Sequence, residues 1–132
     1  MRASELIYDW NQAALALRPT GPVLLNDESL RDGLQSPSVR DPSIAEKIHI
    51  LHLMEDVGIN MLDLGLPGAG PRACEHVEAL AREIVASRLR IKPNCAARTH
   101  QNDIRPIAEI AQRVGLAIEA ATFIGSSPIR RY

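Results

Sequence analysis

Aromatic residues are scarce in this chain of 132 residues, which has one Trp, two Tyr and one Phe. Leu, Ile, Val and Ala must therefore build most of the core of this single domain. A basic surplus is missing too, because the formal net charge is −1. A general nucleic-acid-binding protein carries an excess of Lys and Arg, so we expect no nucleic acid among the partners.

Cysteine and long apolar runs are also in short supply. Cys74 and Cys95 stand far apart, in no metal-ligand spacing, and are predicted to be free thiols of a reducing compartment. Charged residues such as Arg2 and Asp9 interrupt the first twenty residues, so no signal peptide or membrane span is visible. The sequence thus predicts a cytoplasmic location and no membrane partner.

The chain does contain a regular alternation of apolar runs and amphipathic segments. Apolar residues at helical spacing between the runs predict three helices, two of which end at Gly58 and Gly115. The first of these begins either at Asp41 with Pro42, or at Ser43 with Glu46 in a capping box. The third tolerates Pro106 if it begins near Asp103. Strands are predicted at 22–26, 59–67, 89–97 and 116–125, and a leading helix at 4–17.

This order of elements predicts an α/β fold with a parallel sheet and right-handed crossovers. An open doubly wound sheet and part of a (β/α)8 barrel both fit. A whole barrel takes about 250 residues, so by length the chain holds about half of one. We expect a partial (β/α)8 TIM barrel of about four parallel strands with crossover helices at 22–132, preceded by an N-terminal helical extension at 1–21.

Polar residues collect at the ends of the predicted strands, just before the helices that follow. Active and binding sites of α/β proteins usually lie there. They are Asn26, Asp27, Glu28, Arg31, Asp32 and Gln35 after the first strand, Asp63 in the second, Arg98, Thr99 and His100 after the third, and Thr122, Ser126, Ser127, Arg130 and Arg131 near the end of the fourth.

Some of these side chains have ordinary explanations. Asp27 and Glu28 are expected to be solvated loop charges. Arg31 and Asp32 are adjacent, so they cannot form a helical salt bridge, which needs a spacing of three or four residues. Asp63 lies inside an apolar strand, and a buried carboxylate needs a partner. The sequence leaves open whether that partner is an arginine or a ligand of a site.

Three stretches resemble one known family. "DESLRDGLQ" (27–35) resembles the D-x-S/T-L-R-D-G-x-Q signature of the DRE-TIM metallolyase superfamily. "GINMLDLGLP" (58–67) resembles the second-strand pattern of that family, and "TFIGSSPI" (122–129) the fourth-strand segment of its 2-isopropylmalate synthases. The resemblance covers about 23–130 and favours a 2-isopropylmalate synthase-like chain. The string "RDGLQ" also resembles the branch of 3-hydroxy-3-methylglutaryl-CoA lyase.

The resemblance implies a metal-dependent Claisen condensation of acetyl-CoA with a 2-oxo acid. It assigns Asp32 to a divalent metal (Mg, Mn or Zn) and Arg31 to catalysis, where a permanent cation stabilises a developing oxyanion. The remaining residues predicted to bind substrate are Gln35, Asp63, Arg98, Thr122, Ser127 and Arg130.

The family completes its metal site with an H-x-H pair on a late strand, which this chain does not contain. Ala121 and Arg130 stand where relatives often have histidine. Three interpretations follow. The chain is the N-terminal half of a synthase-like barrel and inactive alone, a half-barrel that pairs with another half, or a non-catalytic binding module. Open edge strands favour self-association, so we expect a homo-oligomer.

Overall fold

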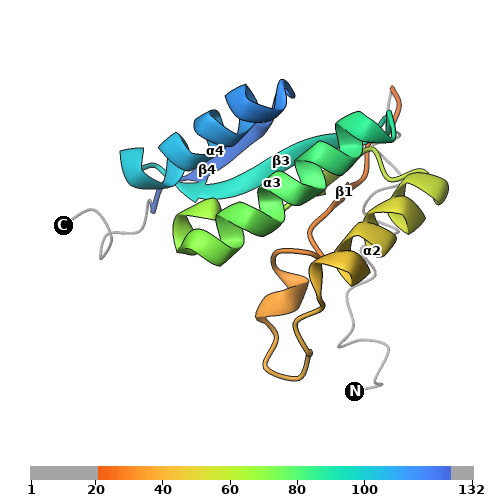
Figure 1. The fold of residues 1–132 in the computed structure, drawn as a ribbon, viewed down its shortest axis with the longest axis horizontal. Coiled ribbons are helices and arrows are strands. Elements are labelled where there is room, and N and C mark those ends of the chain that lie inside the picture. Colours follow the sequence, from red (N-terminus) through yellow and green to blue (C-terminus); the bar gives the residue numbers. More distant parts are fainter. Residues whose placement is uncertain (1–20, 126–132) are drawn as a thin grey trace, which may run out of the picture.

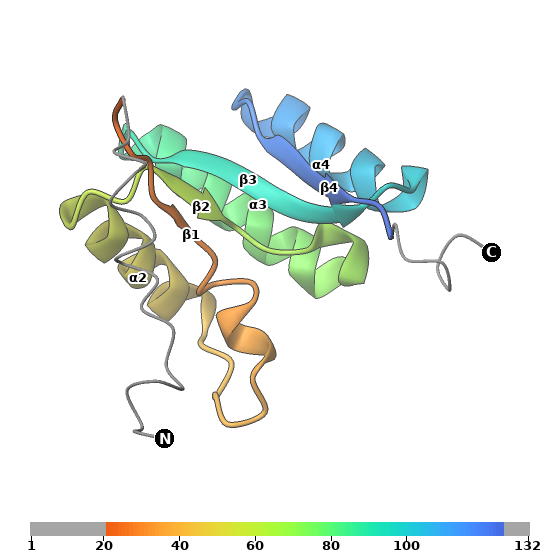
Figure 2. The same ribbon diagram turned by 180° about the vertical axis from the view of Figure 1, so that it is seen from behind.

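The computed structural model describes residues 21–125, which form one sheet of four parallel strands with helices between them. Three α-helices follow the first three strands and cover one side of the sheet (Figures 1 and 2). The strands are β1 (Asn26–Asp27), β2 (Met61–Asp63), β3 (Lys92–Arg98) and β4 (Glu119–Phe123), in the spatial order β1-β2-β3-β4, and the helices are α2 (Ile44–Asp56), α3 (Pro71–Ala86) and α4 (Gln101–Val114).

The sheet is not closed, since β1 and β4 form its two edges. Figure 2 shows the strands in front of the helices, as they would lie on the inner side of a barrel wall. The α/β class and the partial TIM barrel are thereby confirmed. The predicted N-terminal helix at 4–17 lies outside the described residues. None of the described helices is long and apolar enough to cross a bilayer.

Local sequence signals set the ends of α2. The Ser43 hydroxyl accepts a hydrogen bond from the Glu46 N–H at 3.3 Å, and the Glu46 carboxylate accepts one from the Ser43 N–H at 2.7 Å. This reciprocal capping box satisfies two backbone donors. The other predicted start, at Asp41 and Pro42, is wrong: Ser43 is the N-cap of α2, and Asp41 forms ion pairs with Lys47 and Arg72 instead. Gly58 follows the helix with φ 85°, which confirms its predicted end.

Helix α4 begins two residues earlier than predicted. His100 caps it, with its ring Nδ1 accepting from the Asn102 N–H at 3.2 Å. Pro106 therefore lies in the second turn, where it removes one helical hydrogen bond. The helix ends as predicted, at Gly115 in the left-handed region with φ 72°.

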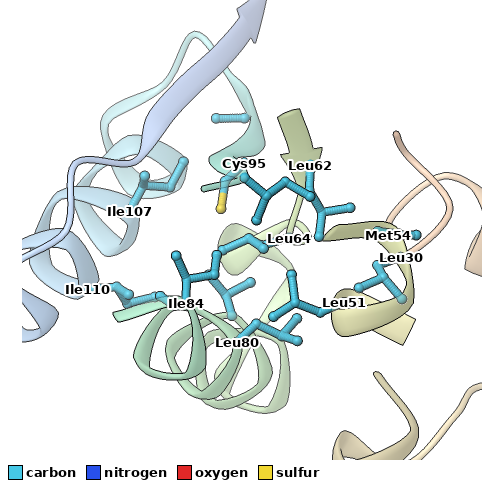
Figure 3. Packing of buried hydrophobic residues seen from close by; sticks show 14 residues of the cluster. Leu30, Leu51, Met54, Leu62, Leu64, Leu80, Ile84, Cys95, Ile107 and Ile110 are labelled. Carbon is cyan, nitrogen blue, oxygen red and sulfur yellow. The ribbon is translucent and has the colours of Figure 1, made fainter. Parts of the chain in front are cut away.

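The core lies between the sheet and the helices (Figure 3). It joins side chains of α2, β2, α3, β3 and α4 with the loop that follows β1, through Leu30, which is 5% exposed. The loop carrying the "LRDG" string is thereby fastened to the core by its own leucine. The largest fully buried hydrophobic side chains are Leu51, Leu62, Leu80, Ile107 and Ile110.

The first predicted strand is much shorter than expected and is not buried. Only Asn26 and Asp27 pair with β2. Val23, Leu24 and Leu25 are 67%, 59% and 56% exposed. The predicted fourth strand forms as β4, but four of its five residues are exposed and one is half-buried.

Candidate functional site

The loop after β1 folds into a tight turn at the carboxyl end of the sheet. The Glu28 carbonyl accepts hydrogen bonds from the N–H groups of Arg31, Asp32 and Gly33, at 3.1, 2.8 and 3.2 Å. The Asp27 carboxylate accepts one from the Ser29 N–H at 2.7 Å, an Asx-type contact that favours the turn. The turn places the adjacent residues Arg31 and Asp32 together at this end of the sheet. We call the cluster of Glu28, Arg31, Asp32 and Asp63 the Arg31 rim.

Arg31 contacts three carboxylates. Its Nε donates to Asp63 Oδ2 at 2.9 Å, its Nη1 to Asp32 Oδ1 at 3.0 Å, and its Nη2 to Glu28 Oε2. Burial by itself lowers the pKa of Arg31, but the hydrogen bond and charge of Asp63, with Glu28 and Asp32, raise it overall. A guanidinium has five N–H donors, so among residues 21–125 three have partners and two remain for another acceptor.

Asp63 is the buried anchor of this arginine. Its side chain is 2% exposed. Its Oδ1 accepts hydrogen bonds from the Gly65 N–H at 3.0 Å and the Ala96 N–H at 3.4 Å, while Oδ2 accepts from Arg31. The alternative that the sequence left open is decided: the partner is an arginine. Asp63 fixes the orientation of Arg31 and offers no free surface to a solute.

A second polar contact ties the loop to the centre of the sheet. Asn94, in β3, is 3% exposed and donates from Nδ2 to Asn26 Oδ1 at 2.7 Å. Asn26 in turn donates to Glu28 Oε1 at 3.4 Å. Sequence reasoning missed Asn94, although an amide inside the apolar run of the third strand was a visible signal.

Arg98 lies in a different ion pair. Its Nε and Nη2 donate to the Asp103 carboxylate at 2.7 and 2.8 Å, and its backbone N–H does so at 3.1 Å. These hydrogen bonds lower the pKa of Asp103 to about 2. Asp103 is 2% exposed and was not singled out as a site residue. The Arg98 side chain is 69% exposed, so it can still contact a ligand. Its partner among the described residues is Asp103 of α4, and it does not contact the carboxylates around Arg31.

The strand register separates Thr122 from Asp63. Thr122 pairs with Ala97, and Asp63 pairs with Asn94. Ala97 belongs to the core beneath the helices, and residues three apart in a strand face opposite sides of the sheet. Thr122 is thus on the helix side. Its predicted role stays a prediction, and Ser127 and Arg130 lie outside the described residues.

Comparison with known proteins shows what kind of chain carries this rim. The family model described as HMGL-like matches residues 23–131. The chain belongs to the HMGL-like family. The resemblance to the DRE-TIM metallolyase superfamily, first seen in "LRDG", is thereby confirmed.

The curated relatives of this HMGL-like chain include several 2-isopropylmalate synthases. The synthase of Pectobacterium atrosepticum is 35% identical over 107 residues, which are 81% of this chain and 19% of the relative. That of Vibrio vulnificus (strain YJ016) is 35% identical over 108 residues, 81% of this chain and 20% of the relative. That of Escherichia coli O1:K1 is 34% identical, with 81% and 19% covered. The chain spans about a fifth of the length of these relatives.

The HMGL-like rim is acidic overall. Arg31 faces Glu28, Asp32 and Asp63, so the cluster carries two net negative charges when all four groups are ionised. Asp32 is the most accessible of the carboxylates, with 65% of its side chain exposed. Among residues 21–125, however, no group of three or more His, Cys, Asp or Glu side chains is arranged to hold a metal ion. The described residues therefore do not form a complete metal site.

Gln35 borders a cavity of about 310 Å³ beside the rim. The cavity is bounded by the loop after β1, the start of α2 and the first half of α3. Arg31 and Lys47 also line it. The structure thus brings Arg31, Asp32, Gln35 and Asp63 into one region, while Arg98 and Thr122 lie apart from it.

Proposed function

We propose that this chain supplies the Arg31 rim of a 2-isopropylmalate synthase-like enzyme, which joins acetyl-CoA to a 2-oxo acid in a Claisen condensation. The observation that carries the proposal is the arginine itself. It is held by the buried Asp63 at the carboxyl end of parallel strands, and two of its N–H donors have no partner within the described part of the chain. The names of the relatives support the choice of reaction.

The chemistry explains why an arginine suits this place. The methyl group of acetyl-CoA must lose a weakly acidic proton, and the resulting carbon nucleophile attacks the ketone carbon of the 2-oxo acid. Negative charge develops on the thioester oxygen and then on the former ketone oxygen. A guanidinium stays charged throughout and donates hydrogen bonds to such an oxygen. Because Asp63 holds Nε, the two free N–H groups of Arg31 keep one direction.

The acidic surroundings of Arg31 bear on the cofactor. Two net negative charges beside a developing oxyanion oppose it unless a cation offsets them. A divalent metal (Mg, Mn or Zn) belongs to the proposal for this reason, with the exposed Asp32 as one ligand. The other ligands would come from outside the described residues, and the chain by itself is proposed to be inactive.

The sequence is also compatible with two other functions. Carbon–carbon cleavage of a hydroxy-acyl-CoA, as by 3-hydroxy-3-methylglutaryl-CoA lyase, is favoured by Leu34 in "RDGLQ" and by the HMGL-like family. A self-associating half-barrel is favoured by the two open edges, β1 and β4. Both are separated from the synthase by the experiment below.

The test uses the protein as its native gene encodes it, assayed for acetyl-CoA-dependent thiol release with a panel of 2-oxo acids. Arg31→Lys should lower kcat about 100-fold or more, the usual effect of losing an oxyanion donor. Asp32→Asn should also lower kcat, because it removes a charged ligand of the proposed metal. Arg105→Lys, at an exposed position on α4, is the control and should leave the rate unchanged.

Release from hydroxy-acyl-CoA substrates alone would move the assignment to the lyase. Absence of both reactions, with a stable half-barrel dimer, would replace the enzyme by the binding module. Thiol release by the 132-residue chain at the rate of the gene product would refute the statement that this chain is inactive alone.

A further inference from the structure

The strand that leads into the Arg31 rim is held by few backbone hydrogen bonds. β1 is an edge of the sheet, and among residues 21–125 only Asn26 and Asp27 of this strand pair with β2. Just before it, the Leu25 carbonyl accepts from the N–H groups of Asn60 and Met61, at 3.2 and 3.0 Å. Segments with few backbone contacts open more easily than a central strand. The position of the rim therefore depends on side-chain contacts as well.

One side chain of the central strand β3 reaches this edge strand. Asn94 Nδ2 donates to Asn26 Oδ1 at 2.7 Å, although β2 lies between β1 and β3 (Figure 2). Asn94 precedes Cys95, and Asn26 pairs with the residue that precedes Leu62. Cys95 and Leu62 belong to the core beneath the helices, and neighbouring residues of a strand face opposite sides. Both amides thus lie on the open face of the sheet, where they join its edge to its centre.

The burial of Asn94 shows that this contact matters. The residue is 3% exposed, and an amide is costly to bury unless it is hydrogen-bonded. In the described part of the chain, the side-chain partner of Asn94 is Asn26. An amide at this position is therefore explained by the contact with β1 rather than by the packing of the core.

Asn26 passes the restraint on to Glu28. Its Nδ2 donates to Glu28 Oε1 at 3.4 Å, and Glu28 Oε2 accepts from Arg31 Nη2. A distance of 3.4 Å is near the upper limit of a hydrogen bond, so a small shift of Asn26 breaks this contact. The Glu28 side chain is 47% exposed, and without Asn26 its carboxylate gains rotamer freedom.

Glu28 and Asp63 hold different parts of the Arg31 guanidinium. Asp63 accepts from Nε, and Glu28 accepts from Nη2. A contact at Nε alone leaves the group able to turn about that hydrogen bond, whereas a second contact fixes its plane, as in paired arginine–carboxylate contacts. Asp32 contacts Nη1, but its side chain is 65% exposed, and ion pairs at such positions are weak.

We propose that Asn94 is a positioning residue of the Arg31 rim, which acts through Asn26 and Glu28 on the plane of the Arg31 guanidinium. Its importance for catalysis rests on the proposed function of Arg31, whereas its effect on the guanidinium does not. Losing Asn94 should cost less activity than losing Arg31, because Asp63 and the donors themselves remain.

The test measures two NMR rates of the Arg31 side chain in the 132-residue chain. One is rotation about the Nε–Cζ bond, which interchanges Nη1 and Nη2, and the other is exchange of the Nε–H with solvent. Asn94→Ala should speed the rotation about fivefold, the factor that corresponds to one net hydrogen bond. It should leave the Nε–H exchange almost unchanged, because Asp63 still accepts from that group. A general loosening of the fold would raise both rates together.

Two further variants control for stability and for folding. Ile107→Val, at a residue of α4 that is 2% exposed, loosens the core away from the rim and should change neither rate selectively. Asn26→Ala breaks the same hydrogen bond from an exposed position and should also speed the rotation. The double variant with Asn94→Ala should match Asn26→Ala, because one contact cannot be lost twice. If Asn94→Ala does not fold, Asn26→Ala decides.

The activity of the native gene product gives the second readout. Asn94→Ala should lower kcat about fivefold and leave KM almost unchanged, because a misaligned donor affects the transition state more than the bound substrate. If the gene product catalyses no condensation but the two NMR rates separate as expected, the proposed function fails and the positioning role stands.

The positioning role is overturned by either of two results. Unchanged rotation in Asn94→Ala or in Asn26→Ala would show that the contact does not reach Arg31. An equal rise of both rates would make Asn94 a residue of general stability only.

Discussion

Replacing Asp63 by alanine should destabilise the chain far more than replacing the neighbouring rim carboxylate, Asp32. Asp63 is 2% exposed and accepts hydrogen bonds from Arg31 and from the N–H groups of Gly65 and Ala96. Asp32 is 65% exposed and contacts only Arg31 among the described side chains. The two substitutions remove the same chemical group from opposite environments.

The expected cost follows from what each partner loses. Breaking a fully buried ion pair costs about 3–5 kcal/mol. Arg31 keeps Glu28 and Asp32, and its side chain is 21% exposed, so about 2 kcal/mol is expected for this part. The Gly65 N–H loses its acceptor, for about 1 kcal/mol, while the Ala96 N–H keeps the Gly65 carbonyl at 3.1 Å. Asp63→Ala should therefore cost about 3 kcal/mol, and Asp32→Ala about 0.5 kcal/mol.

Urea unfolding followed by circular dichroism measures both free energies of unfolding, and a double-mutant cycle with Arg31→Met isolates the pair. Arg31→Met combined with Asp63→Ala should cost less than the two single changes added together, by about 1–2 kcal/mol. If Asp63→Ala costs no more than Asp32→Ala, or if the coupling is near zero, Asp63 is not the anchor of Arg31 and the argument for a fixed guanidinium fails.

Two further predictions concern the core and the second ion pair. Leu51→Ala, at a side chain with 0% exposure, should lower the free energy of unfolding by about 3 kcal/mol. Leu53 lies on the same helix and is 48% exposed, so Leu53→Ala should lower it by less than about 1 kcal/mol. Equal losses in urea unfolding would contradict the assigned buried face of α2. The Arg98 guanidinium depresses the pKa of Asp103 from 3.8 to about 2. The stabilising contribution of this ion pair is therefore complete above about pH 4 and is lost as the pH falls through about 2. Asp103→Asn should flatten the fall in Tm over this window, and an unchanged pH profile would refute the pairing.

Several parts of the fold and site could be read from short stretches of sequence. Ser43 and Glu46 stand three residues apart and form the capping box at the start of α2. Gly58 and Gly115 take the positive φ values that end α2 and α4. The "LRDG" string places Arg31 and Asp32 in one turn, because Glu28 lies within hydrogen-bonding reach along the chain. Each of these signals acts over a few residues, where backbone geometry leaves few choices.

Other predictions were wrong or incomplete because they depend on contacts between residues far apart in the sequence. Val23–Leu25 has the apolar composition of a buried strand, yet these residues are exposed, and composition alone does not show whether another element covers them. Thr122 follows an apolar run just as Asp63 lies in one, but the register puts the two on opposite faces of the sheet. The pairing of Arg98 with Asp103 competes with a substrate role that the sequence alone suggested.

The sequence by itself determined the alternation of strands and helices, the C-terminal ends of α2 and α4, and the grouping of Arg31 and Asp32 in one turn, since each depends on neighbours along the chain. Only the tertiary structure decided that Arg31 is held by Asp63, 32 residues away, and that Lys47 meets His76, 29 residues away. Those contacts exist because parallel strands bring their carboxyl ends to one edge and α2 packs beside α3. A side chain far away in sequence becomes a neighbour only when register and helix packing are set.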